Sequence, residues 1–202
     1  MSIDRKINRI QFLTGNSLKF IAVLTMVIDH LCKIVLQWLL SNYWGSMVDN
    51  EQMSWERFQE IDNLIRFDLQ SIGTIAFPLF CFLLAEGFQH TRSKKRYIGL
   101  MLAFALISEI PFDIGFFSAY SRMEGTFPFY LKYQNVFFTL FLGLLTLVCL
   151  ERFSCESDLP VDRIKSVVLQ VLSVVLFSSI AEGIRCDYGM PVSYTHLRAH
   201  ET

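Results

Sequence analysis

Long apolar runs separated by shorter polar segments dominate the chain. A helix that crosses a bilayer needs about 20 mostly apolar residues, with a working range of about 17–25. Several runs meet or approach this length, and none alternates in the way that a half-buried strand would. The pattern therefore predicts an all-α, polytopic transmembrane helix bundle with about five spans. The expected spans are Leu18–Leu40, Ile72–Phe88, Tyr97–Ile114, Asn135–Leu150 and Ile164–Ile184.

The segment Ser41–Ser71 between the first two runs has a pattern of its own. Apolar residues recur there at helical spacing, with acidic residues between them. We expect an amphipathic helix that lies on the outer face of the membrane, or alternatively a short cap packed on the bundle. The apolar positions are Trp55, Phe58, Ile61, Leu64 and Ile65.

Basic residues are distributed unevenly between the segments that flank the apolar runs. Lys and Arg in excess mark the cytoplasmic side of a membrane protein. They are densest before the first run and after the second, so we expect a cytoplasmic N-terminus. These residues are Arg5, Lys6, Arg9, Lys19, Arg92, Lys94, Lys95 and Arg96.

Composition agrees with a membrane protein and excludes other classes. Hydrophobic residues make up 52% of the 202 residues and charged residues only 18%, whereas soluble domains carry about 25% charged residues. The net charge of -1 offers no basic excess for nucleic-acid phosphates. Five cysteines at irregular spacing fit neither a disulfide framework nor a zinc site, and we expect no bound metal.

The first apolar run contains Asp29, His30 and Lys33. A charge at the centre of a membrane helix costs about 2.5–3.5 kcal/mol, so such residues face a protein interior or a wet cavity. Asp29 and Lys33 are four residues apart and can form an ion pair on one face. This cluster predicts either a functional site or a structural polar pair that locks helix packing.

The later runs carry further polar residues. Glu86 and His90 share a helical face, and Pro111 is expected to kink the third run beside Glu109. Pro78 is expected to kink the second run in the same way. With alternating spans, Asp29, His30, Glu109, Asn135 and Glu182 fall in the outer half of the membrane, and Glu86, His90 and Arg92 form a cytoplasmic group. Asp113, Thr139 and Asp187 lie beside the outer group.

Several blocks, in order, resemble motifs of the TraX family. They include Met26–His30, Ile75–Phe80 with Glu86–Phe88, and Ala105–Asp113. Asn135–Leu140 and Asp187–Gly189 complete the set. Where the family usually has an Arg before the Ile-Ala-Phe-Pro block, this chain has Thr74.

The resemblance implies a bacterial inner-membrane acetyltransferase. TraX-like proteins are associated with conjugation, and the namesake acetylates the N-terminus of pilin. The family is also similar to membrane acyltransferases that use cytoplasmic acetyl-CoA. By resemblance, we expect acetyl-CoA as donor, and a pilin-like protein or an envelope glycan as acceptor, in a membrane lipid environment.

The resemblance makes His30 the candidate base, since His titrates near neutral pH. Asp29 is adjacent and points about 100° away around the helix, so Glu109 is an equally plausible carboxylate partner. The basic run from Arg92 to Arg96 is expected to hold the CoA phosphates or to anchor the topology. The positions expected to bind substrate are Glu86, Thr91, Arg92, Asn135, Thr139 and Asp187.

Two other functions fit the same residues. In an ion-coupled transporter, Glu86 and Glu109 would relay protons or bind a cation. In a non-catalytic membrane subunit, the polar residues would serve packing alone. The sequence counts against the transporter, because it shows no internal inverted repeat of the kind that is common in such proteins.

The last residues differ from the rest of the chain. The stretch Val192–Thr202 resembles the translation of a sequencing adapter. We therefore expect a TraX-like transmembrane domain over residues 1–190 and an artefactual tail over residues 191–202. On this reading the natural chain continues with further spans.

Overall fold

The computed structural model describes residues 15–154 and 159–186. These residues are almost entirely helical, with a single isolated bridge between Gln134 and Cys186. The chain divides into two compact units, Met1–Leu83 and Leu84–Thr202. Helix α7 (Ala76–His90) carries the chain from the first unit into the second. The expected all-α architecture is confirmed.

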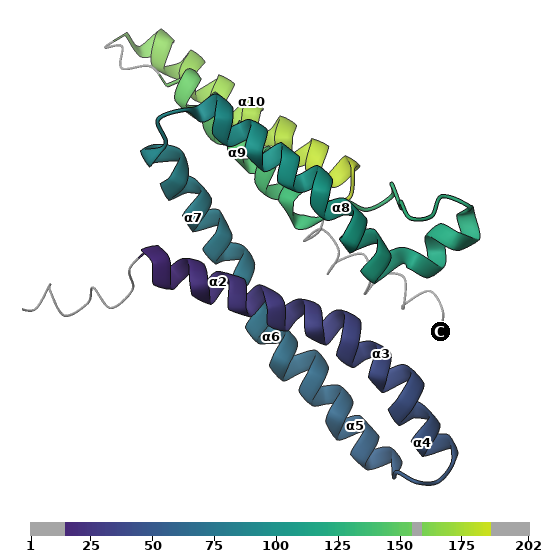
Figure 1. Cartoon of the computed structure of the whole chain (residues 1–202). Coiled ribbons are helices and arrows are strands. Elements are labelled where there is room, and N and C mark those ends of the chain that lie inside the picture. Colours follow the sequence, from purple (N-terminus) through teal and green to yellow (C-terminus); the bar gives the residue numbers. More distant parts are fainter. Residues whose placement is uncertain (1–14, 155–158, 187–202) are drawn as a thin grey trace, which may run out of the picture. The chain divides into compact units, whose positions relative to one another are not determined.

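The first unit is a helical hairpin with two long arms (Figure 1). The first arm is helical from Gly15 to Asp49, and the second begins at Trp55. Both arms include wider, π-helical turns, at Leu31–Leu36, Leu40–Trp44 and Leu64–Leu69. The α-helical parts are α2 (Gly15–His30), α3 (Gln37–Leu39), α4 (Gly45–Asp49), α5 (Trp55–Asn63) and α6 (Gln70–Gly73).

The two arms are held together by the amphipathic pattern noted in the sequence. Ile65 is buried against Cys32 and Leu40 of the first arm. Residues one and two turns away on both arms extend this contact: Ile28, Leu36, Trp44, Phe58, Ile61 and Leu69.

The expectation of a loop and a separate surface helix over Ser41–Ser71 is therefore not met. The segment completes the two arms of the hairpin, and only the turn between Asp49 and Trp55 interrupts it. The apolar stripe of α5 packs on the first arm, as in the alternative of a packed cap, because its partners recur at matching helical spacing. Ser54 caps α5 by accepting a hydrogen bond from the backbone N–H of Arg57.

The second arm breaks at Thr74 and Ile75, immediately after α6. A turn forms there, in which the N–H of Ile75 donates to the carbonyl of Ile72 at 3.3 Å. Helix α7 then starts at Ala76, so Pro78 lies in its first turn. Proline is tolerated there because the first backbone N–H groups have no helical partner. In place of the expected kink at Pro78, the helix breaks three to four residues earlier, at Thr74 and Ile75.

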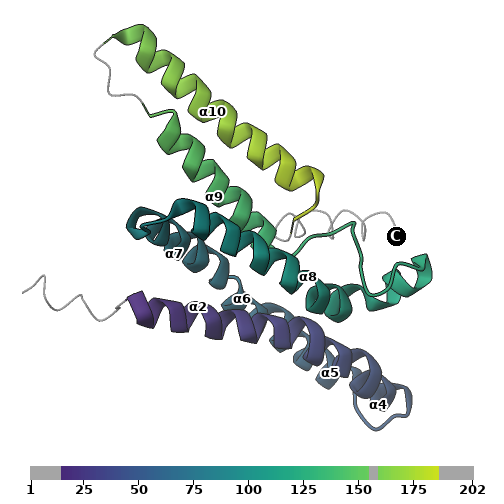
Figure 2. The ribbon, with the colours of Figure 1, turned by 45° about the horizontal axis from the view of Figure 1, so that its top comes forward.

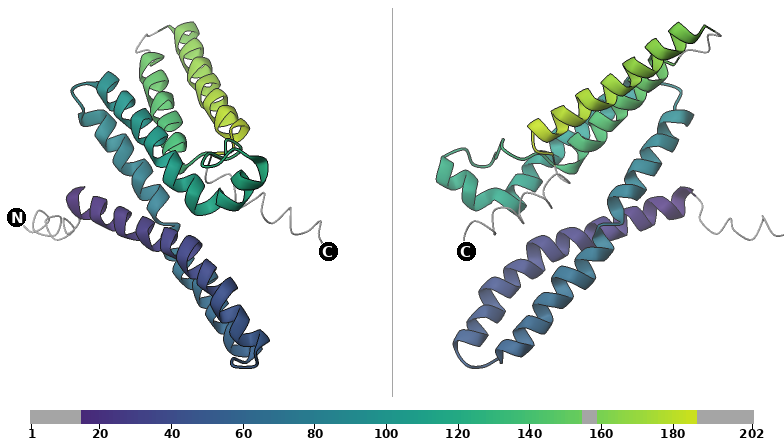
Figure 3. Two further views of the ribbon diagram at one scale, coloured as in Figure 1. Left: turned by 45° about the vertical axis from the view of Figure 1, so that its right-hand side comes forward. Right: turned by 180° about the vertical axis from the view of Figure 1, so that it is seen from behind.

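The second unit contains three further long helices: α8 (Lys94–Glu124), α9 (Val136–Arg152) and α10 (Pro160–Gly183). Helix α9 packs between α8 and α10, running beside each (Figure 2). Its buried side is apolar, and it contains the fully buried Leu144. Helix α8 stays continuous through Pro111 and changes direction towards its C-terminal end (Figure 3).

Within the described residues, four helical stretches are long and apolar enough to cross a membrane: Gly15–Asp49, Trp55–His90, Lys94–Met123 and Pro160–Gly183. They contain three of the five expected spans in full, and a fourth, Ile164–Ile184, except for its last residue. The remaining one is helix α9, whose 17 residues extend about 26 Å at 1.5 Å per residue. That length is at the short end of the spanning range. Only 11% of the apolar window in α10 is buried within the protein, as expected for a helix that faces lipid. The protein is a multi-span membrane protein.

Candidate functional site

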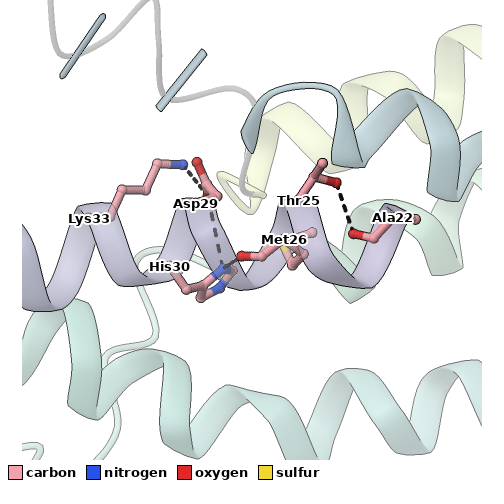
Figure 4. Close-up of polar contacts among 6 residues, drawn as sticks. All are labelled: Ala22, Thr25, Met26, Asp29, His30 and Lys33. Atoms are coloured by element: carbon pink, nitrogen blue, oxygen red, sulfur yellow. Dashed lines mark hydrogen bonds and ion pairs between the residues drawn. The ribbon is translucent and has the colours of Figure 1, made fainter. Parts of the chain in front are cut away.

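Asp29 is the centre of a charged cluster in the first unit. Its carboxylate is 9% exposed and lies 2.8 Å from the ammonium group of Lys33. The Nδ1 atom of His30 is 3.9 Å from the same carboxylate oxygen, Oδ2 (Figure 4). The ion pair expected from the spacing of four residues is therefore present. It largely compensates the charge that Asp29 introduces into a membrane-spanning helix.

The imidazole of His30 has a defined orientation and tautomer. Its Nδ1 atom lies 3.0 Å from the backbone carbonyl of Met26, one turn earlier. A carbonyl oxygen only accepts hydrogen bonds, so Nδ1 carries the proton and Nε2 is the basic nitrogen. The side chain is 39% exposed. The ring of His30 is therefore oriented through Nδ1, and Nε2 is the nitrogen that can accept a proton.

Gly73 allows α6 to approach α2 directly at Asp29. A Cβ atom at position 73 would lie 2.6 Å from Oδ1 of Asp29 and 2.9 Å from its Cα, and still closer to its Cβ. Gly73 is buried. Because the backbone of Asp29 cannot rotate away, only glycine permits this separation of the two arms.

We expect Gly73→Ala to destabilise the protein by about 1–3 kcal/mol, at the upper end because backbone is involved. The measurement is thermal unfolding in lipid nanodiscs. Gly99→Ala is the matched control, since Gly99 is also helical and nothing lies within 4 Å of its added Cβ. That variant should be neutral or stabilising by about 0.5–1 kcal/mol. Equal behaviour of the two variants would contradict the close approach.

Thr74, which stands where the family usually has Arg, is exposed and directly follows Gly73. Its hydroxyl donates to the backbone carbonyl of Ser71 at 2.7 Å. The threonine side chain thus stabilises the break between α6 and α7, and it brings no charge to the cluster around Asp29.

Glu109 is the centre of a second polar cluster, in the second unit. Its Oε2 atom accepts from the backbone N–H of Asn135 at 3.2 Å and from the side-chain amide of Asn135. The same amide donates to the carbonyl of Ala105 at 2.9 Å. The Oδ1 atom of Asn135 accepts from the N–H of Phe137 and so caps α9. One asparagine therefore ties the start of α9 to the middle of α8.

Asp113 lies one turn beyond Glu109 on α8 and is fully buried. Its Oδ2 atom accepts a hydrogen bond from the backbone N–H of Tyr130 at 2.8 Å. The Tyr130 ring stacks on Phe117, which also stacks on Tyr133, with ring centroids 4.9 and 5.2 Å apart. The loop between α8 and α9 is thus folded back over the carboxyl groups of α8.

Charged residues at the rim of this loop are paired or lie over rings. The hydrogen bond from Lys132 to the Glu124 carboxylate raises the pKa of the Lys132 ammonium group. The guanidinium of Arg185 lies 5.5 Å from the Tyr133 ring centroid. The backbone N–H of Gln134 donates to the carbonyl of Arg185 at 3.2 Å, which ties the loop to the end of α10.

The expected cytoplasmic group lies around the connection from α7 to α8. Glu86, His90 and Arg92 are exposed, and Thr91 is half-buried. Ser93 caps α8 by accepting from the N–H of Arg96. Of the basic residues there, Lys94 is paired with Glu151 and lies 4.6 Å from the Phe88 ring centroid, and Lys95 and Arg96 are exposed.

The structure confirms some of the expected groupings. It brings Asp29, His30 and Lys33 together, and it joins Glu109 to Asn135. Thr139 is half-buried one turn into α9, and Glu182 is exposed on α10. Contact between His30 and Glu109 stays a prediction, because the two residues belong to different units. Asp187 and the expected tail lie outside the described residues.

The sequence analysis did not predict three features of the two polar clusters. These are the close approach of Gly73 to Asp29, the hydrogen bond from the backbone of Tyr130, and the complete burial of Asp113. The signal for Gly73 was present, since a glycine inside a helical pattern often marks close backbone approach. Tyr130 contributes its backbone N–H, so its side-chain type gave no signal.

Comparison with known proteins agrees with the motifs. A model of the TraX protein family matches residues 14–195. The chain is 31% identical over 186 residues to a protein of Dichelobacter nodosus named "Probable fimbrial assembly protein FimC, serogroup H1". The alignment covers 91% of the chain and 60% of that relative, so the chain spans about 60% of the relative's length. No solved structure matches. On the family match and its motifs, this membrane protein belongs to the TraX family.

Proposed function

We propose that the protein is a membrane-embedded acetyltransferase that moves an acetyl group from acetyl-CoA to an amine or hydroxyl acceptor. The observation that carries this proposal is His30, whose Nδ1 is fixed on the Met26 carbonyl and whose ring lies beside the Asp29 carboxylate. A histidine in this tautomer presents a basic nitrogen inside a membrane-spanning helix, where an unused polar side chain is costly.

The proposed reaction is a single acyl transfer. Nε2 of His30 takes a proton from the acceptor amine or hydroxyl as its nitrogen or oxygen attacks the thioester carbon. The new C–N or C–O bond forms, the C–S bond breaks, and the CoA thiolate leaves and takes up the proton from His30. Asp29, 3.9 Å from Nδ1, stabilises the positive charge that the imidazole carries between the two proton transfers.

Lys33 sets the electrostatic state of Asp29. Its ammonium lies 2.8 Å from the carboxylate and offsets the negative charge of Asp29. Because Asp29 balances Lys33, a proton on His30 gives the three groups one net positive charge instead of the two that they would carry without the carboxylate.

The phosphates of CoA would be held by the basic residues at the start of α8. Arg92, Lys95 and Arg96 are exposed there, and the helix begins at Lys94 without acidic residues in its first turn. Guanidinium groups and a helix N-terminus both suit phosphate binding.

For the acceptor, the resemblance and the name of the Dichelobacter nodosus relative support a pilin-like protein. An amine at a protein N-terminus fits the proposed base, and an envelope glycan would offer a hydroxyl in its place. We place the protein in the bacterial inner membrane with its N-terminus in the cytoplasm, where acetyl-CoA is available. The uneven distribution of Lys and Arg supports that orientation.

The test is acetyl transfer by the full chain in lipid nanodiscs, with acetyl-CoA labelled in its acetyl group. Acceptors are a peptide with a free α-amine, the same peptide already N-acetylated, and a bacterial envelope extract that contains proteins and glycans. We expect label in the free-amine peptide or in the extract, and none in the acetylated peptide. Folded protein that labels no acceptor above the protein-free background would overturn the proposal.

A further inference from the structure

The carboxyl groups of Glu109 and Asp113 share an unusual arrangement. One oxygen of each accepts hydrogen bonds from N–H groups of the following loop, at Asn135 and Tyr130. The other oxygen of each, Oε1 of Glu109 and Oδ1 of Asp113, is buried and has no hydrogen-bond partner among the described residues. The side chains are 94% and 100% buried, so these oxygens are sealed from solvent.

No positive charge compensates this pair in the part of the chain that the structure describes. The ion pairs found there join other residues. Glu109 lies 15 residues into α8, about 22 Å along the helix. Two ionised carboxylates this close, in a membrane-spanning helix, would repel each other and would lack solvation.

A bound proton would remove the repulsion between the two carboxylates and would give their unpaired oxygens a hydrogen-bond partner. Residues four apart on a helix have Cβ atoms about 5–6 Å apart, so the free oxygens of Glu109 and Asp113 are within reach of each other. One proton converts an acceptor into a donor and gives both oxygens a partner. A metal ion fits less well, because no group of three or more His, Cys, Asp or Glu side chains gathers within the described residues.

We propose that Glu109 and Asp113 form a proton-binding site that holds one shared proton between Oε1 and Oδ1. The proton keeps the loop between α8 and α9 closed on α8, because it allows both carboxyl groups to accept the loop N–H bonds at once. Loss of the proton leaves two adjacent negative charges and opens the loop. This site is independent of the proposed acetyl transfer.

The surroundings contain few competing groups. From α9 and its cap the facing group is Asn135, which does not titrate. From the loop, Tyr130 faces the pair, with its ring stacked on Phe117. The cations nearest along the chain point elsewhere: Lys132 pairs with Glu124, and Arg185 lies over Tyr133.

The test is difference infrared spectroscopy of the full chain in nanodiscs as the pH is raised. We expect a carboxylic-acid C=O band that shifts in D2O and disappears at high pH, with loss of loop protection in amide hydrogen exchange. Glu109→Gln and Asp113→Asn should each remove the band and the pH dependence of loop protection. Glu151→Gln, an exposed carboxylate on α9, is the matched control and should change neither.

Three results would overturn the proposal. The first is the absence of a carboxylic-acid band in the parent protein. The second is a band that persists unchanged in both variants. The third is loop protection that depends on Na⁺, Mg²⁺ or Ca²⁺ against choline at constant ionic strength, which would assign the site to a cation. If one variant fails to fold, the spectrum of the parent protein and that of the other variant still show whether the two carboxyl groups share a proton.

Discussion

His30→Gln is expected to lower acetyl transfer by about 10²–10⁴-fold, because general acid–base catalysis contributes that factor. Glutamine keeps a polar side chain of similar length but has no basic nitrogen. The parent histidine donates from Nδ1 to the Met26 carbonyl, which leaves Nε2 as the proposed base. The measurement is the initial rate of label transfer from acetyl-CoA in nanodiscs. This factor corresponds to about 2.7–5.5 kcal/mol of transition-state stabilisation.

The matched control is His90→Gln, which changes the other histidine within the described residues. His90 is exposed at the end of α7, and its replacement should leave the rate within about twofold. Thermal unfolding of both variants checks that the fold is retained. If His30→Gln transfers acetyl as fast as the parent, His30 is not the base, even where the acetyltransferase activity itself is found.

Asp29→Leu is expected to destabilise the protein by about 2.5–3.5 kcal/mol, because it leaves the Lys33 ammonium uncompensated in a membrane-spanning helix. The pair is 2.8 Å apart, and the carboxylate is 9% exposed. Lys33 is 34% exposed, so part of this cost is relieved if its long side chain reaches the interface. Thermal unfolding in nanodiscs measures the effect.

The double variant Asp29→Leu/Lys33→Leu should recover most of the lost stability, because it removes both charges together. Glu124→Gln is the control, since it breaks an exposed pair with Lys132 and should cost no more than about 1 kcal/mol. Equal destabilisation of the single and double variants would show that the pair contributes through leucine packing defects and not through charge.

Local patterns in the sequence predicted much of the secondary structure and one of the ion pairs. Run lengths gave the helices, and the spacing of four residues gave the Asp29–Lys33 pair, because both depend on neighbours along one helix. The amphipathic stripe of α5 was predicted correctly, but its partner was left open between the membrane surface and the helix bundle. A stripe of Phe58, Ile61 and Ile65 buries equally well against lipid or against Cys32 and Leu40, and periodicity does not distinguish the two.

The sequence by itself determined an all-α membrane protein of the TraX family and the cluster of Asp29, His30 and Lys33. Only the tertiary structure decided that Gly73 meets Asp29, 44 positions away, and that Asn135 and Tyr130 hold the carboxyl groups of α8. These contacts join residues far apart in the chain through backbone atoms that every residue type possesses. Residue type therefore does not predict most of these contacts. They become visible only when the path of the chain in space is known.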